Sequence, residues 1–151
     1  MIESPSPQPG DEGQQAAART FACHAARLLA DSHCEQTLVL DVRGISQVTD
    51  FLVITTGTSD RQIRSLGQDL KDLGRLEDHQ PLSLHGTDTG QWVVVDFADV
   101  VVHLFEAEVR TYYDLESLWA DGKTVDWEAV TEPGQFARLA AQRSAQKEDR
   151  S

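Results

Sequence analysis

The stretch Gln91–Phe105, QWVVVDFADVVVHLF, decides the fold of this chain. It consists of two runs of β-branched and aromatic residues, separated only by the short break Ala98-Asp99. Such runs with a two-residue break are typical of an antiparallel hairpin, because these residue types favour strands and the break supplies the turn. With Ala98 and Asp99 as the turn, Trp92 lies opposite Phe105, and every position between them has a fixed partner.

The two faces of this predicted hairpin differ, because side chains alternate along a strand. One face carries only apolar side chains: Val93, Val95, Phe97, Val100, Val102 and Leu104. The other face mixes types, placing Trp92, Val94 and Asp96 opposite Phe105, His103 and Val101. The first face is predicted to line the core. On the second face, we interpret Asp96 and His103 as a structural hydrogen-bonded pair.

Hydrophobic periodicity along the rest of the chain predicts three more strands and three helices. The strands fall at 37–42, 49–56 and 81–85, and the helices at 14–31, 59–73 and 106–121. Five strands with helices before, between and after them predict an α/β fold, in which helices pack on the faces of a five-stranded mixed sheet. The strand at 49–56 is nearly all apolar, which indicates burial on both faces.

The segment Gly57-Thr58-Ser59 lies between this buried strand and the second helix. A glycine-containing turn before a helix can bind an anion, but the sequence has neither a phosphate-loop lysine nor a G-x-G-x-x-G motif. Ser59 and Gln62 instead form a capping-box pattern, in which each side chain bonds the backbone near the other. We interpret the segment as a turn with an N-cap, and we expect Gly74 to end the helix.

The chain of 151 residues is long enough for one domain. Residues 1–13 are rich in proline and glycine and are predicted to be a flexible leader. Residues 14–121 form the predicted domain. Residues 122–151 are predicted to be a C-terminal extension, partly helical or disordered, in which Asp126-Trp127 packs back on the body and 135–146 forms a short helix.

Charge and hydropathy limit the classes of partner. The chain has 25 acidic and 13 basic residues and a net charge of −12, which argues against a protein that grips phosphate backbones. Docking on a basic protein is more consistent with this charge. No apolar run approaches the roughly 20 residues that cross a bilayer, and the start resembles no signal peptide. We expect a cytoplasmic protein without membrane contact.

Two cysteines, Cys23 and Cys34, lie eleven positions apart in or at the end of the first helix. This spacing corresponds to about 16 Å along a helix at 1.5 Å per residue. The distance excludes a disulfide within that helix and a shared tetrahedral zinc centre. We expect buried thiols and no metal.

Catalysis has weak support. Asp41, Asp50, Asp96 and Asp99 could form a magnesium cluster for nucleotidyl transfer, but Arg61 and Arg64 are the only nearby cations for a triphosphate. His103, Asp96 and a serine could form a hydrolase triad, but no G-x-S-x-G elbow is present. We expect no enzyme and no cofactor.

Aromatic residues gather in the hairpin and in the helix that follows it. Tyr and Trp are enriched where proteins bind partners, because they bury large areas and keep a polar group. Trp92 follows an exposed loop, and Tyr113 lies on the rim of the helix, so we predict that both face a partner. Tyr112 and Trp119 fall on the apolar stripe of the helix and are predicted to complete the core.

Three segments carry a resemblance to a known family: DVRGISQVTDFLVITTGTSDRQIRSL at 41–66, GQWVVVDFADVVVHLF at 90–105 and EVRTYYDLESLW at 108–119. Together they resemble the ribosomal silencing factor family, also called Iojap-like proteins. The resemblance implies a non-catalytic protein related in fold to nucleotidyltransferases. It further implies docking on ribosomal protein L fourteen of the large subunit, which obstructs joining of the small subunit and lowers translation when nutrients are scarce.

The resemblance also implies a set of partner-binding residues and a self-association. The family's docking surface corresponds here to Trp92, Tyr113, Asp114, Leu115 and Glu116, while the stripe analysis puts Leu115 towards the core. A homodimer of the unbound protein is expected, and no sequence-specific nucleic acid binding. Two alternatives stay open, a large-subunit assembly factor and a residual magnesium-dependent nucleotidyltransferase.

Overall fold

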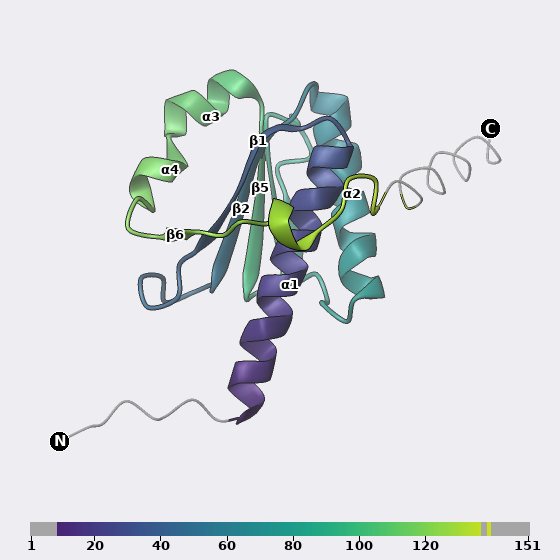
Figure 1. The fold of residues 1–151 in the computed structure, drawn as a ribbon. Helices are drawn as coiled ribbons and strands as arrows, with labels where there is room; N and C mark the ends of the chain where they lie inside the picture. The colour runs from purple at the N-terminus through teal and green to yellow at the C-terminus, as the bar shows by residue number, and fades with distance from the viewer. Residues whose placement is uncertain (1–8, 137–138, 140–151) are drawn as a thin grey trace.

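A computed structural model describes residues 9–136 and 139 of the chain (Figure 1). A single sheet runs through it with strand order β3-β4-β5-β2-β1-β6, and only β2 and β5 pair in parallel. The predicted α/β class and the mixed sheet are therefore confirmed. The helices and strands are α1 (Pro9–Asp31), β1 (Glu35–Asp41), β2 (Phe51–Thr56), α2 (Asp60–Leu76), β3 (Ser83–His85), β4 (Trp92–Asp96), β5 (Val100–Phe105), α3 (Ala107–Tyr113), α4 (Leu115–Leu118), β6 (Lys123–Thr124) and the 3-10 turn η1 (Glu128–Val130).

The sheet has six strands, and the prediction of five was wrong. The additional strand is β6, whose two residues pair antiparallel with Leu40 and Asp41 of β1. Two exposed polar residues carry no strand periodicity, so this pairing comes from where the chain runs rather than from its local pattern. The expected likeness to nucleotidyltransferases stays a prediction.

The central hairpin has the predicted register. Trp92 lies opposite Phe105, Val94 opposite His103 and Asp96 opposite Val101. The backbone N–H of Phe97 donates to the carbonyl of Val100 over 2.9 Å, which closes the turn. The expected core face is likewise confirmed, because its side chains are almost fully buried: Val93, Val95, Phe97, Val100, Val102 and Leu104.

Strand β2 is the central ribbon of the fold. All six of its residues are buried, as predicted from its continuous apolar sequence. It pairs with β1 on one side and with β5 on the other, so both its edges and both its faces are covered. Burial of this kind requires layers on both faces of the sheet.

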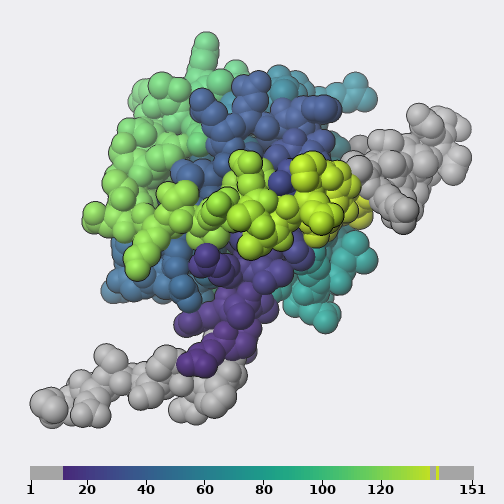
Figure 2. Space-filling model, in the orientation of Figure 1, coloured from purple at the N-terminus to yellow at the C-terminus, as the bar shows by residue number. Residues whose placement is uncertain are grey.

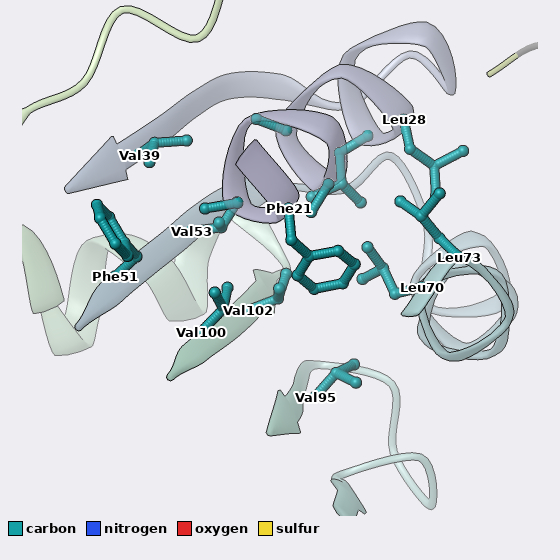
Figure 3. Packing of buried hydrophobic residues seen from close by; sticks show 14 of the residues in the cluster. Phe21, Leu28, Val39, Phe51, Val53, Leu70, Leu73, Val95, Val100 and Val102 are labelled. Atoms are coloured by element: carbon teal, nitrogen blue, oxygen red, sulfur yellow. The ribbon is translucent and has the colours of Figure 1, made fainter. Parts of the chain in front are cut away.

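Helices α1 and α2 form the first of these layers. They pack together on the sheet face that carries Val53, Val95 and Val102. Figure 3 shows the Phe21 ring between these strands and Leu70 of α2. Phe21 also stacks on the His79 ring and meets the Phe97 ring edge-on, with centroids 4.7 Å apart in both cases. The larger core therefore lies between α1, α2 and this face.

The second layer consists of the short helices α3 and α4, which Figure 1 places on the opposite side of the sheet. They cover a smaller cluster, whose buried members are Leu40, Val42, Leu52, Ile54 and Phe105. One continuous helix from 106 to 121 was predicted, and that prediction was wrong. Asp114 adopts left-handed backbone angles, φ 46° and ψ 55°, and separates the two helices.

Helix boundaries differ from the expected ones at two places. Helix α1 begins at Pro9, five residues before the predicted start, and α2 continues past Gly74 to Leu76. A Cβ on Gly74 would collide with the His79 carbonyl and the Phe97 ring, so this glycine permits close packing and does not end the helix. The predicted N-cap is confirmed, since the Ser59 hydroxyl accepts from the backbone N–H of Gln62 over 3.1 Å.

Residues 123–136, which we call the strap, run from β6 across the middle of α1 (Figure 2). The Trp127 indole N–H donates to the Thr37 carbonyl over 3.1 Å, and the Arg27 guanidinium lies 4.9 Å from the centroid of the Trp127 ring. The prediction that Asp126-Trp127 packs back is confirmed by this buried tryptophan. Most of the helix expected at 135–146, and residues 1–8 of the expected leader, lie outside the described residues.

The two cysteines are buried free thiols, as predicted. Cys23 and Cys34 are both buried and unpaired, and burial raises the pKa of the Cys34 thiol to about 11. Neither thiol is therefore a reactive nucleophile at neutral pH. Within the described ranges, no helix has the length and apolar character needed to cross a membrane.

Candidate functional site

Four aromatic rings form a continuous stack from the second core to the surface. We call Phe105, Trp92, Tyr113 and Tyr112 the aromatic ladder. Phe105 is fully buried, and the half-buried Trp92 ring lies on it with centroids 4.8 Å apart. Tyr113 of α3 lies 4.7 Å from Trp92, and Tyr112 meets Tyr113 edge-on at 5.0 Å. The ladder joins the hairpin to α3 and ends in solvent.

His103 fixes the orientation of Trp92. The Trp92 indole N–H donates to Nδ1 of His103 over 3.1 Å, so this nitrogen carries no proton and the neutral ring is protonated on Nε2. Burial lowers the pKa of His103 from 6.5 to about 4, which keeps the imidazole neutral at physiological pH. The expected Asp96–His103 pair was wrong: the Asp96 carboxylate instead accepts from the backbone N–H of Ala98 over 2.7 Å.

Asp114 forms the turn between α3 and α4. Its left-handed backbone is among the conformations that aspartate and asparagine adopt more readily than most other residues. Its backbone N–H donates to the Arg110 carbonyl over 2.9 Å, and the Ser117 hydroxyl donates to its carboxylate over 2.5 Å. The turn directs Tyr112 and Tyr113 outwards, while Leu115 packs inwards.

Arg110 anchors both short helices to the sheet. Its Nε donates to the Glu116 carboxylate over 2.5 Å, and its Nη1 donates to the Thr56 hydroxyl and the Gln36 carbonyl at 2.9 and 2.8 Å. These bonds join α3, α4, β1 and β2 at one point. A polar pocket surrounds this guanidinium, with Glu35, Gln36, Thr56, Ala107, Thr111, Asp114 and Glu116 on its walls.

Some of the predicted partner-binding residues lie together at the surface, whereas others pack beneath that surface or bond to its neighbours. Trp92 and Tyr113 are in ring contact, and Asp114 follows directly with an exposed side chain. Leu115 is half-buried against the second core, which agrees with the stripe analysis. Glu116 is held in the Arg110 ion pair, and its side chain is 29% exposed.

Sequence reasoning missed two surface residues. Tyr112 was predicted to lie in the core, and that was wrong, because 82% of its surface is exposed. Leu118 is 72% exposed on α4. The prediction for Tyr112 required one continuous helix from 106 to 121. Because the helix breaks at Asp114, the side chains of α3 and α4 do not share the single apolar stripe that a continuous helix would give them. The sequence feature that could have indicated this break is Asp114, which directly follows the two tyrosines. Trp119, also predicted to be core, is half-buried against the second cluster.

The edge of this aromatic surface is acidic. Glu108 and Asp114 are exposed beside the tyrosines, and Glu106 and Glu116 are half-buried nearby. The one basic residue of α3, Arg110, is already engaged by Glu116. The surface therefore combines exposed aromatic rings with carboxylates.

The four aspartates considered for a magnesium cluster are brought together only in part: the charges of Asp99 and Asp41 act on Asp50, whereas Asp96 caps the hairpin turn. Asp41 binds Arg43 at 2.6 Å, and this hydrogen bond lowers the pKa of the Asp41 carboxyl. Asp50 is half-buried, and desolvation followed by the nearby Asp99 charge raises its pKa. Among the described residues, no three His, Cys, Asp or Glu side chains are arranged to hold a metal ion.

Fold and surface together define a class: a small α/β protein that presents an aromatic, acid-rimmed surface suited to binding another macromolecule. A family model described as "Ribosomal silencing factor during starvation" matches residues 15–151. The chain belongs to this family.

Individual relatives agree with this assignment. The chain is similar to "Ribosomal silencing factor RsfS" of Bacillus subtilis, with 40% identity over 102 residues, covering 68% of this chain and 86% of that protein. The protein of the same name from Halalkalibacterium halodurans is 37% identical over 106 residues, covering 70% and 91%. A crystal structure of a Chromobacterium violaceum protein superposes with a TM-score of 0.62 at 27% identity, covering 78% of this chain and 93% of that one.

Proposed function

We propose that this protein represses translation by binding the large ribosomal subunit. The contact is with ribosomal protein L fourteen, and the bound protein obstructs joining of the small subunit when nutrients are limiting. The chain belongs to a family described as "Ribosomal silencing factor during starvation". This description supports the ribosome as the target and nutrient limitation as the condition under which the protein acts. The names of the bacterial relatives support the same role.

The observation that carries this proposal is the aromatic ladder. Its outer rings, Tyr113 and Tyr112, are 54% and 82% exposed, and they continue into Trp92 and the buried Phe105 without a gap. Rigid aromatic side chains backed by a packed core lose little conformational entropy on binding, so they are effective hot spots. A surface of this kind fits protein docking better than catalysis.

The acidic rim supports a basic partner. Glu108 and Asp114 flank the exposed rings, and the whole chain has a net charge of −12. Complementary charge speeds the encounter of two proteins and disfavours wrong partners. Proteins that bind ribosomal RNA need clustered Lys and Arg, so a ribosomal protein is a partner of the required charge.

The five predicted residues take different roles in this proposal. Trp92 and Tyr113 contact the partner through their rings, and Asp114 contacts it through its exposed carboxylate. Leu115 supports the surface from below, because it packs on the second core. Glu116 holds Arg110 and also offers its partly exposed carboxylate to the partner.

The proposal is of a cytoplasmic binding protein that is not an enzyme and needs no cofactor. An unbound molecule is proposed to pair with a second copy through the same aromatic surface, since exposed rings of this size favour self-association. Ribosome binding and self-association then compete for one surface.

The first alternative is a role in assembly of the large subunit. A reconstituted subunit-joining assay separates it from the main proposal. With purified subunits, the silencing proposal expects added protein to lower the fraction of joined ribosomes. A protein that acts only in assembly would leave joining unchanged.

The second alternative, a residual magnesium-dependent nucleotidyltransferase, has less support. Asp41 is engaged by Arg43, and Asp96 caps a turn. Calorimetry with a nucleoside triphosphate and magnesium tests it directly. No nucleotide binding is expected, and binding that disappears in Asp50→Asn or Asp96→Asn would favour the enzyme.

Co-sedimentation with purified large subunits tests the docking surface. Trp92→Ala and Tyr113→Ala are each expected to weaken binding by at least about thirtyfold, which corresponds to a loss of about 2 kcal/mol at a hot spot. Val48→Ala is the matched control: Val48 is 83% exposed, yet it lies by the hairpin turn residues Ala98 and Asp99, at the opposite end of the hairpin from Trp92.

Folding must be intact for this comparison. Circular dichroism and urea unfolding of each variant supply that control. If folded Trp92→Ala and Tyr113→Ala bind large subunits as tightly as the Val48→Ala control, the aromatic ladder is not the docking surface. If purified L fourteen alone competes for the wild-type protein, the named partner is supported.

A further inference from the structure

The solvent face of α2 carries a regular stripe of basic side chains. Residues 61, 64, 68, 71 and 75 are spaced by three and four, and they are Arg, Arg, Gln, Lys and Arg. At about 100° per residue they fall within one narrow sector of the helix, opposite its buried side. We call Arg61, Arg64, Gln68, Lys71 and Arg75 the basic stripe. It holds four of the 13 basic residues of a chain that has 25 acidic ones.

Two cations of the basic stripe are available for a partner. Within the described part of the chain, neither the Arg61 side chain nor that of Lys71 forms an ion pair. Arg64 and Arg75 make only exposed pairs, with Asp60 and Asp72 respectively, both at 3.4 Å. Exposed pairs of this kind contribute about 0–1 kcal/mol, so a stronger anion can displace them.

A groove rich in hydroxyl groups runs beside the first half of the basic stripe. Its lining includes Ser32, Ser59, Ser65 and Thr87, together with Arg61, Arg64 and Asp69. The hydroxyls of Ser32 and Ser59 also bond the Leu28 carbonyl and the Gln62 backbone N–H. Arg64 fixes the loop that closes it, because its Nε and Nη2 donate to the carbonyls of Thr87 and Asp88 at 2.7 and 3.1 Å. Hydroxyls beside guanidinium groups are the usual contacts of phosphate oxygens.

We propose that the basic stripe docks on the phosphate backbone of an RNA helix. The net charge of −12 argues against phosphate binding for the chain as a whole, but the charge on α2 is distributed differently. The stripe spans about 21 Å at 1.5 Å per residue, a length that can meet several consecutive phosphates. Backbone contacts of this type carry no sequence preference.

This site is separate from the proposed L fourteen surface. Helix α2 packs on the sheet face with Val93 and Val95, whereas the aromatic ladder stands on the opposite face with Trp92. The ribosome offers both protein and RNA, so a protein seated between them can use both sides. RNA contact on the α2 side goes beyond the proposed function and does not depend on which ribosomal protein the ladder binds.

Salt dependence of binding to purified large subunits is the first test. The double variant Arg61→Glu, Lys71→Glu is compared with Arg19→Glu, Lys123→Glu, which lowers the net charge equally at exposed positions on α1 and β6. Each lost phosphate contact removes about 0.9 from the slope of log affinity against log salt for duplex nucleic acid. Between 50 and 200 mM salt, wild-type affinity is expected to fall about tenfold more than that of the stripe variant.

The class of partner is identified by cross-linking. A photo-reactive residue is placed in the middle of the stripe as Gln68→benzoylphenylalanine, and the full-length protein is irradiated on large subunits. The cross-linked product is expected to become smaller when it is treated with ribonuclease. A product whose size ribonuclease leaves unchanged would mean that α2 faces an acidic protein, and it would overturn the RNA proposal.

The two docking proposals fail in distinguishable ways. If the stripe variant and its control show the same salt slope, the RNA contact is wrong, whatever Trp92→Ala does. If Trp92→Ala binds normally while the stripe variant loses salt dependence, the ladder proposal is wrong and the RNA contact stands. Circular dichroism of both charge variants confirms that α2 is folded, which is expected because Arg61 is exposed and Lys71 is only half-buried.

Discussion

The two faces of the sheet are covered by very different helices. On one side, α1 and α2 have 23 and 17 residues, and Val93, Val95 and Leu104 beneath them are fully buried. On the other side, α3 and α4 have seven and four residues, and the adjoining strand positions Trp92, Val94, Val101 and His103 remain half-buried. Long helices cover the sheet on their side completely, whereas short ones expose part of it.

This difference separates stability from binding. Burial contributes about 25 cal/mol per Å² of apolar surface, so the face under α1 and α2 supplies most of the folding free energy. The face under α3 and α4 leaves part of its apolar surface for association. A core variant under α1 and α2 and an exposed variant of α3 should therefore have opposite signatures, and the first and last of the following predictions test that separation.

The largest effect on stability is expected from Phe21→Ala. The Phe21 ring is 1% exposed and packs between the His79 and Phe97 rings, so its removal leaves a cavity. The free energy of unfolding should fall by about 3–5 kcal/mol in urea titrations. The fraction that remains folded should bind large subunits as the wild type does. A loss below 1 kcal/mol would show that this core is not tightly packed.

A second large effect should appear as a pH dependence set by His103. Its pKa is about 4 in the folded chain and near 6.5 in the unfolded one, so the unfolded state takes up a proton first. Stability should consequently fall as the pH drops from 6.5 towards 4, by up to about 3 kcal/mol at 1.36 kcal/mol per pKa unit. Above pH 7 this contribution is constant.

The variant His103→Gln isolates this term, because glutamine accepts from the Trp92 indole without titrating. Asp50 titrates in the opposite direction, since its raised pKa favours the folded state at low pH. The quantity to measure is therefore the difference between wild type and variant across pH 4–7 in urea titrations. A difference that does not vary with pH would contradict the burial of a neutral His103.

An intermediate effect is expected from Arg110→Met. Methionine keeps the aliphatic volume but removes the bonds to Glu116, Thr56 and the Gln36 carbonyl. Loss of about 2 kcal/mol is expected, because the partly buried partners lose their donor. Hydrogen exchange should become faster in α3 and α4 but stay unchanged in α1. Arg110→Lys, which retains the charge, should lose less, and equal losses would mean that the guanidinium hydrogen bonds rather than the charge account for the stabilisation.

The smallest effect on stability is expected from Tyr112→Ala, at the exposed end of the aromatic ladder. The unfolding free energy should change by less than about 0.5 kcal/mol, as for most surface substitutions. Binding to large subunits should nevertheless weaken by about tenfold, or about 1.4 kcal/mol. The control Val48→Ala removes a side chain of similar exposure, 83%, away from both proposed docking surfaces and should change neither quantity. Unchanged binding by Tyr112→Ala would limit the surface to Trp92 and Tyr113.

Strong local patterns in the sequence predicted much of the fold. The hairpin register follows from a two-residue break between apolar runs, and the burial of β2 follows from its continuous apolar sequence. The Ser59 cap follows from side-chain chemistry within four residues. In each case the deciding interactions are local or lie between strands adjacent in sequence.

Features decided by distant contacts could not be predicted in this way. Strand β6 has only Lys123 and Thr124, and its pairing depends on where the strap crosses α1. The position of α3 and α4 on the sheet involves Arg110, which bonds groups more than fifty positions away. Asp96 and His103 lie on the same face, but the imidazole accepts a hydrogen bond from the indole N–H of Trp92 instead of pairing with Asp96. The rings of Trp92 and Tyr113 lie in contact, so these two predicted residues share one surface, whereas the exposure of Tyr112 was missed.

The strap has a consequence for aggregation. A sheet edge with unpaired backbone groups can recruit strands from other chains, and natural proteins cover or shorten such edges. Here β6 occupies the outer edge of β1, Val125 adds a backbone bond to Val39, and the opposite edge strand β3 has only three residues. A chain ending at Asp121 would retain the aromatic ladder but expose this edge. Residues outside the quoted motifs thereby cover the backbone edge of β1, through which another chain could otherwise add a strand.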